Sequence, residues 1–141
     1  MNKKNVLIAD LLVGYVKLHN IHFNVVGNGF KEAHEYFEHL YDDVHDFYDE
    51  VAERVRMDGD IPVASVKKYL ELTTIKDAED KEHSIEEAYK IALDLYKSFK
   101  NSVHELRNEA DEKGDYAWVG LMEDIADNLD KEIWMMESFL K

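Results

Sequence analysis

Histidines and carboxylates recur in the first half of the sequence at spacings that suit a transition-metal site. His22 and His34 stand on either side of a glycine-containing break, and three acids follow. Counted from His34 at about 100° per helical residue, Glu38 lies at about 40° and Asp49 at about 60°. Glu53 lies at about 100°, so these three acids and His34 share one face of a predicted helix.

One straight helix cannot bring these groups to a single metal cluster, because Glu38 and Asp49 are roughly 16 Å apart along its axis. A second copy of the chain, packed antiparallel about a two-fold axis, would bring Asp49 and Glu53 to the first copy's His34. His22, at the end of the preceding helix, would close the site. The dimer would then hold two equivalent sites. Imidazoles with carboxylates suit Fe(II), Mn(II) or Zn(II), and the many carboxylates favour iron.

Other interpretations of these residues stay open at this stage. Charge runs such as DDVHDFYDE (42–50) are usually solvated helix faces. An isolated histidine is more often a surface or packing residue than a ligand. We interpret His19 as packing, and we place four further histidines in the surface or packing class: His39, His45, His83 and His104. A di-iron centre inside one bundle would need Glu-x-x-His on two helices, and none of the seven histidines has that spacing.

Four long helices are predicted to position these residues. Apolar spacing and stop signals predict them over about residues 6–26, 30–57, 84–111 and 116–140. A short helix within residues 63–72 and an acidic linker join the second to the third. Ser84 is the N-cap candidate of the third, and Glu87 would complete a capping box. The chain is therefore predicted to be a single all-α domain over 1–141, a four-helix bundle with a short extra helix in the crossover.

Composition excludes several classes of function. The chain has 141 residues and no cysteine, so disulfides, thiolate nucleophiles and iron–sulfur clusters are excluded, and a cytoplasmic protein is expected. The net charge of -14 disfavours nucleic-acid binding and attracts divalent cations. No segment is predicted to span a membrane, and the start of the chain is a poor signal peptide.

The segment LHNIHFNVVGNGFKEAHEYFEHLYDDVHDFYDEVAERV (18–55) resembles the Dps family, the ferritin-like mini-ferritins of bacteria and archaea. That family's pattern is His-x-x-His-Trp, then Gly, Phe and His-x-x-x-Asp, followed by Asp-x-x-Ala-Glu-Arg. The later DKEIWMMESFL (130–140) resembles the family's last helix. The short crossover helix also lies where the family has one, so the resemblance covers essentially the whole chain.

The resemblance implies a ferritin-like bundle that assembles into a hollow dodecamer. Such a particle oxidises Fe(II), preferably with hydrogen peroxide rather than oxygen, stores Fe(III) mineral inside and protects against oxidative damage. Paired Fe(II) ions supply two electrons to peroxide, which avoids the one-electron step that frees hydroxyl radical. Other divalent metals such as Zn or Mn can take the place of iron. The implied ferroxidase ligands, shared across a two-fold interface, are His22, His34, Glu38, Asp49 and Glu53.

Three positions depart from the family pattern. Glu38 stands where aspartate is usual. Its longer side chain keeps the charge but alters the expected distance between the metal ions. Phe23 stands where tryptophan is usual, so an oxidisable ring is missing. The lysine-rich tail by which some members bind DNA is reduced to Lys3 and Lys4, so DNA binding is not expected. The candidates for an acidic pore at a three-fold axis are Asp115, Glu123, Asp124 and Asp127.

Two alternative functions are kept beside the iron-storing ferroxidase. One is a di-iron or di-manganese oxidase acting on a small molecule, and the missing Glu-x-x-His pair argues against it. The other is a DNA-protecting structural assembly with a vestigial metal site. The negative charge argues against that function.

Overall fold

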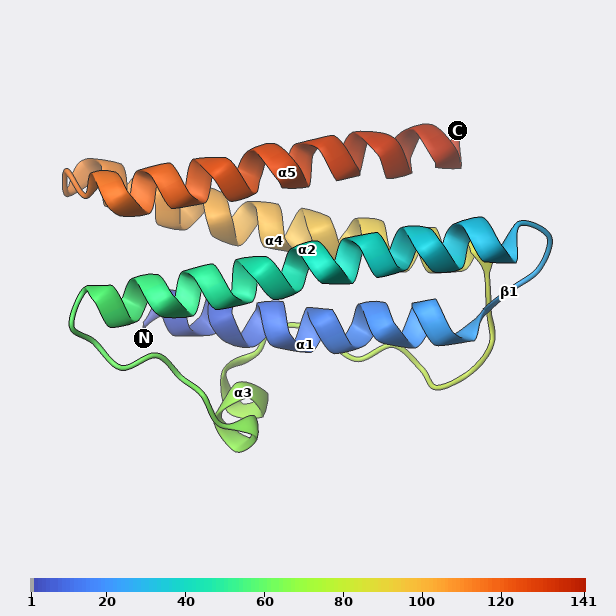
Figure 1. The fold of residues 1–141 in the computed structure, drawn as a ribbon, viewed down its shortest axis with the longest axis horizontal. Helices are drawn as coiled ribbons and strands as arrows, with labels where there is room; N and C mark the ends of the chain where they lie inside the picture. Colours follow the sequence, from blue (N-terminus) through green and yellow to red (C-terminus); the bar gives the residue numbers. More distant parts are fainter. Residues whose placement is uncertain (1) are drawn as a thin grey trace.

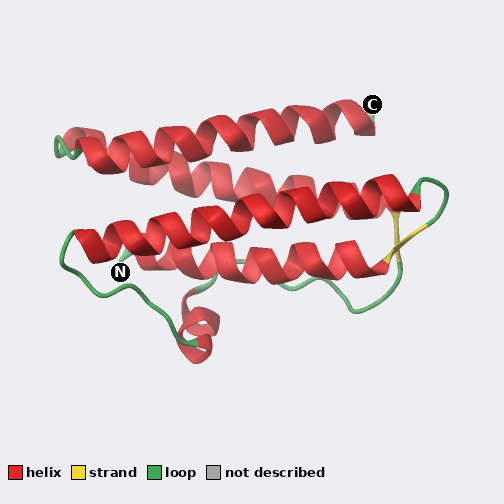
Figure 2. Ribbon diagram, in the orientation of Figure 1, coloured by secondary structure: helices red, strands yellow, loops and turns green. Residues whose placement is uncertain are grey.

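A computed structural model describes residues 2–141 and has the architecture that the sequence predicts, a four-helix bundle with a short helix in the crossover (Figures 1 and 2). The long helices are α1 (Lys3–Asn24), α2 (Phe30–Met57), α4 (Ile85–Glu112) and α5 (Tyr116–Leu140). The short elements are α3 (Val66–Leu72), β1 (Val25–Val26) and β2 (His83–Ser84). Helix α1 packs beside α2, α4 packs beside α5, and α3 lies outside the bundle against α1.

The helix ends follow local hydrogen-bonding chemistry. Helix α1 begins three residues earlier than the apolar pattern predicts, because the Asn2 side chain accepts the backbone N–H groups of Lys4 and Asn5. It also ends two residues earlier, because Val25 and Val26 are extended and pair in parallel with β2. Ser84 caps α4 as predicted, with its hydroxyl oxygen 3.1 Å from the backbone nitrogen of Glu87.

The bundle core is apolar and tightly packed between α1 and α4. Leu7, Ile8, Leu11 and Phe99 are almost completely buried there. Gly14 faces α4: a Cβ atom at this position would be 2.5 Å from Cζ of Phe99. The absence of a side chain at residue 14 is therefore what allows this approach.

Helix α1 is long and apolar, but it lies in the bundle core. By length and composition it could cross a membrane, and it is the one helix among residues 2–141 that could. In the fold, however, its apolar residues pack into the bundle core, including Leu18 and Ile21, which are fully buried. This burial is what a core helix of a bundle requires.

The crossover between α2 and α4 is fastened to α1 by a buried carboxylate. Asp10 is 2% exposed, and its Oδ1 accepts the Thr73 hydroxyl at 2.8 Å and the Thr74 backbone N–H at 2.7 Å. The Thr74 hydroxyl donates to Oδ2 at 2.8 Å. These three hydrogen bonds satisfy a charge that would otherwise be costly to bury.

A second carboxylate joins the end of α2 to the start of α5. The indole Nε1–H of the buried Trp118 donates to Oδ2 of Asp58 at 2.6 Å, and Arg54 donates to Oδ1 at 3.0 Å. The Trp118 hydrogen bond, opposed by burial and helped by Arg54, lowers the pKa of Asp58 below its ordinary 3.8. The carboxylate therefore stabilises the fold fully above pH 3.8, and this stabilisation is lost as the pH falls through the lower pKa of the folded state.

We predict that Asp58→Asn lowers the free energy of unfolding at pH 7 by about 1–2 kcal/mol, because a charge-assisted hydrogen bond and an ion pair are lost. The deficit should shrink below about pH 4, where Asp58 itself becomes protonated. Urea unfolding at pH 7 and pH 3, at matched protein concentration, measures both values. The control is Asp60→Asn, an exposed acid nearby. An equal deficit at both pH values would contradict the assignment.

Candidate metal centre

His22 and His34 form a reciprocally hydrogen-bonded pair beside the turn between α1 and α2. Nδ1 of His22 is 2.8 Å from the carbonyl oxygen of His34, and Nδ1 of His34 is 2.8 Å from the carbonyl oxygen of His22. The two rings stack, with centroids 3.7 Å apart and planes at 16°. The fold thus brings together these two residues, which the sequence analysis selected as ligands from different helices.

These hydrogen bonds fix the proton on each ring. A carbonyl oxygen can only accept, so each Nδ1 carries its hydrogen and donates it. In a neutral imidazole the lone pair for a metal is then on Nε2. Neither Nε2 atom has a hydrogen-bond partner within residues 2–141. Both rings are therefore held in the tautomer whose Nε2 lone pair is free to bind a metal.

Aromatic packing holds the pair in place. Phe30 stacks on His34 with centroids 5.1 Å apart, and Tyr41 meets His22 edge-on at 5.1 Å. On its other side Tyr41 stacks against His19, at 3.8 Å. Burial and then the charge of Glu38 raise the pKa of Tyr41, so its hydroxyl keeps its proton at neutral pH.

The predicted carboxylate ligands are exposed and do not converge on the histidines within one subunit. Glu38 lies one turn beyond His34 on the same face of α2. Asp49 and Glu53 are farther along the axis, roughly 22 Å and 28 Å from His34 at 1.5 Å per residue. One subunit therefore carries the two imidazoles with Glu38 at one end of α2, and two carboxylates at the other end.

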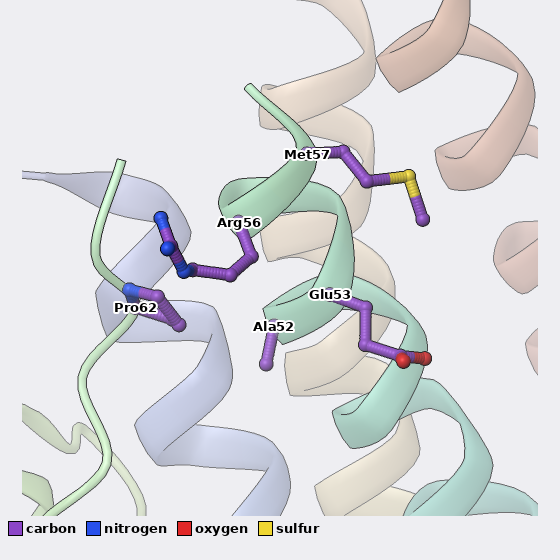
Figure 3. A pocket seen from close by; sticks show the side chains of 5 residues that line it. All are labelled: Ala52, Glu53, Arg56, Met57 and Pro62. Atoms are coloured by element: carbon purple, nitrogen blue, oxygen red, sulfur yellow. The ribbon is translucent and has the colours of Figure 1, made fainter. Parts of the chain in front are cut away.

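Glu53 lies in a pocket of about 460 Å³ at the far end of α2, lined also by Ala52, Arg56, Met57 and Pro62. Figure 3 shows Glu53 and Met57 projecting from the same side of α2, while Arg56 extends towards Pro62. Met57 is 68% exposed. The candidate ligand Glu53 therefore lies beside the solvent-exposed apolar side chain of Met57.

The pore and tail candidates have other contacts in this subunit. Asp115 caps α5 by accepting the backbone N–H of Trp118, and Glu123 pairs with Arg107 at 3.1 Å. Asp124 and Asp127 are exposed. In the tail, Lys3 pairs with Glu109 at 3.2 Å and Lys4 lies over the Trp118 ring.

Sequence reasoning missed one cluster, in which His39 and Asp43 of α2 meet Glu132 of α5. Within residues 2–141 these are the only three His or acidic residues whose ligand atoms all lie within 4.8 Å of one another. His39 was interpreted as a surface or packing residue. A signal was present in the sequence: Glu132 interrupts the apolar positions of α5 between Leu129 and Met136, where an acid is unexpected.

Comparisons with known proteins identify the family and the fold. The ferritin-like domain model matches residues 3–141. The DNA protection during starvation protein of Brevibacillus brevis is 39% identical over 137 residues, which are 95% of this chain and 89% of that protein.

Solved structures give the same result. Antigen TpF1 from Treponema pallidum superposes with a TM-score of 0.97 at 34% identity, covering 99% of this chain and 89% of that one. The Dps protein of Vibrio cholerae, described as a member of a broad superfamily of ferritin-like diiron-carboxylate proteins, gives 0.95 at 29% identity, with 99% and 87% covered. On this evidence the chain belongs to the Dps family of ferritin-like proteins.

Proposed function

We propose that this protein is a cytoplasmic ferroxidase that stores iron. It oxidises Fe(II), preferably with hydrogen peroxide, at di-iron sites shared by two subunits, and deposits Fe(III) mineral inside a hollow dodecamer. The balanced step is the oxidation of two Fe(II) to two Fe(III) by one peroxide, which takes up two protons and leaves two waters. The observation that carries the proposal is the His22–His34 pair, whose Nε2 lone pairs are free to bind a metal.

The numbering of α2 supports a shared site. In an antiparallel pair of identical helices, residues opposite each other have numbers with a constant sum. His34 with the partner's Glu53 gives 87, and Glu38 with the partner's Asp49 also gives 87. One register therefore aligns both pairs. Around the axis of α2, His34, Glu38, Asp49 and Glu53 lie at roughly 0°, 40°, 60° and 100°. Each of the two pairs is therefore centred on the same direction, at roughly 50°.

The same register matches other exposed residues of α2. It sets Phe30 opposite the partner's Met57, so that apolar side chains flank the metal ligands on both subunits. Phe30 and Met57 are 43% and 68% exposed in one subunit. Near the two-fold axis it sets His45 opposite the partner's Asp42, an imidazole facing a carboxylate. Apolar flanks around a polar centre would exclude water from the site.

The iron-storage proposal accounts for more of the chain than the two alternatives. A small-molecule oxidase would place its metals inside one subunit, between Glu-x-x-His motifs that the helices lack. DNA protection is favoured by the name of the Brevibacillus brevis relative. Here, however, the net charge is -14 and Lys3 is paired with Glu109.

We predict that replacing both His22 and His34 by alanine lowers the initial rate of Fe(II) oxidation by roughly a hundredfold or more. Loss of groups that only support metal ligands already costs about 10–100-fold, and here the ligands themselves are removed. Stopped-flow absorbance of Fe(III) measures the rate. His104→Ala, on the exposed surface of α4, is the matched control. An unchanged rate in the double variant, with the oligomer intact, would show that the site assignment is wrong.

We predict that Met57→Asp separates the subunits and abolishes mineral storage, because a charge replaces apolar surface beside the shared site. After anaerobic addition of Fe(II) and substoichiometric peroxide, size-exclusion chromatography with in-line iron detection should show iron eluting with a particle of about twelve subunits. The variant should elute smaller and without iron. Asn101→Asp adds the same charge on α4 and should behave as wild type. If the wild-type protein elutes as a monomer or dimer while the iron precipitates, the storage proposal is refuted.

We predict that the protein does not retard plasmid DNA in a gel at low salt, because repulsion between its net charge of -14 and the phosphates is strongest there. Glu109→Gln, which frees Lys3, should also fail to retard DNA. Retardation by the wild type that disappears with added salt would instead support the DNA-protecting function.

A further inference from the structure

His39, Asp43 and Glu132 form a compact group of potential metal ligands between α2 and α5. Nε2 of His39 is 3.0 Å from Oε2 of Glu132 and 3.5 Å from Oδ2 of Asp43. Metal–ligand bonds of about 2.1 Å separate neighbouring ligand atoms by roughly 3.0 Å in octahedral and 3.4 Å in tetrahedral geometry. The two separations from His39 match these values, and all three ligand atoms lie within 4.8 Å of one another, so one ion fits between them without movement of the backbone.

His39 is the one ion-pair partner of the two carboxylates within residues 2–141. Glu132 is 4% exposed, and among residues 2–141 neither it nor Asp43 forms an ion pair with a lysine or arginine. A buried carboxylate such as that of Glu132 is costly unless a cation joins it. A single imidazolium would neutralise one charge, whereas a divalent ion would neutralise both.

Neighbouring polar groups orient the ligands. The Tyr36 hydroxyl donates to Oε1 of Glu132 at 2.8 Å, which leaves Oε2 facing His39. The Asn128 amide donates to Oδ2 of Asp43 at 3.4 Å. Oδ1 of that amide is buried and has no hydrogen-bond partner within residues 2–141. Supporting hydrogen bonds of this kind surround metal ligands, and an unpaired buried oxygen suits an ion or its bound water.

The cluster is separate from the interface site. His39 follows Glu38 directly, so it projects about 100° away around α2. Glu38 lies on the face assigned to the partner subunit, whereas His39 contacts α5 of its own subunit. His39 is also half exposed, which gives an ion a route to the two carboxylates.

We propose that His39, Asp43 and Glu132 bind one divalent first-row transition-metal ion within each subunit, independently of the interface site. The donor set of one imidazole and two carboxylates suits Zn(II), Fe(II) or Mn(II). This proposal does not depend on the proposed ferroxidase function, because all of its ligands come from one chain.

Zn(II) binding to the assembled protein in the His22→Ala, His34→Ala background tests the proposal with the interface site disabled. Isothermal titration should find one Zn(II) per subunit. A crystal soaked with Zn(II) should give an anomalous-scattering peak within bonding distance of His39, Asp43 and Glu132. Adding His39→Ala should weaken binding at least tenfold, and His104→Ala should leave it unchanged.

Glu132→Gln is the second variant, because it keeps the size of the side chain and its contact with Tyr36 while removing the charge. It should also weaken Zn(II) binding at least tenfold, with unchanged helicity and oligomer size. The proposal is overturned if the background variant takes up no Zn(II), if His39→Ala and Glu132→Gln bind it as before, or if the anomalous peak lies elsewhere.

Discussion

The reciprocal hydrogen bonds between His22 and His34 are the interaction on which the arrangement of the candidate interface site depends most. The carbonyl of His22 lies in the last turn of α1, where backbone oxygens lack helical partners, and the His34 ring supplies one. The return bond ties His22 to α2. The two bonds fix where α1 ends relative to α2. They also place a hydrogen on Nδ1 of both rings, so the closing of the α1–α2 hairpin leaves both Nε2 atoms without a partner within residues 2–141.

Helix α2 divides its surface between three environments. One face carries the apolar residues of the core, a second carries the exposed residues assigned to a two-fold partner, and a third approaches α5 through His39 and Asp43. Because helical residues three and four apart share a face, 28 residues are enough to serve all three. The acidic residues of α2 therefore belong to different faces: Glu38, Asp49 and Glu53 to the face assigned to the partner, and Asp43 to the face that approaches α5.

The parts of the fold that rest on periodicity and stop signals were predictable from the sequence. Helices α2 and α5 have the predicted ends, because glycine, proline and apolar spacing mark them unambiguously. The capping box of α4 formed only in part: Ser84 accepts from Glu87, but the Glu87 carboxylate contacts Lys81 and His83 instead of returning to Ser84. That outcome depends on neighbours brought in by the crossover, which local sequence does not reveal.

The candidate site was predictable to a similar degree. The pairing of His22 with His34 follows from a hairpin of adjacent helices. The cluster of His39 with Glu132 was not found, because it joins residues 93 positions apart and depends on how α2 and α5 are rotated.

The short pairing of β1 with β2 has a consequence for the order of folding. It joins Val25 to His83, and the nearby fastening of Asp10 to Thr74 spans 64 positions, so both close long loops at a high entropic cost. The hairpins α1–α2 and α4–α5 close much shorter loops and are expected to form first. All five interface ligand candidates belong to the α1–α2 hairpin, so the half-sites that a partner must complete arise within one of the two units expected to fold early.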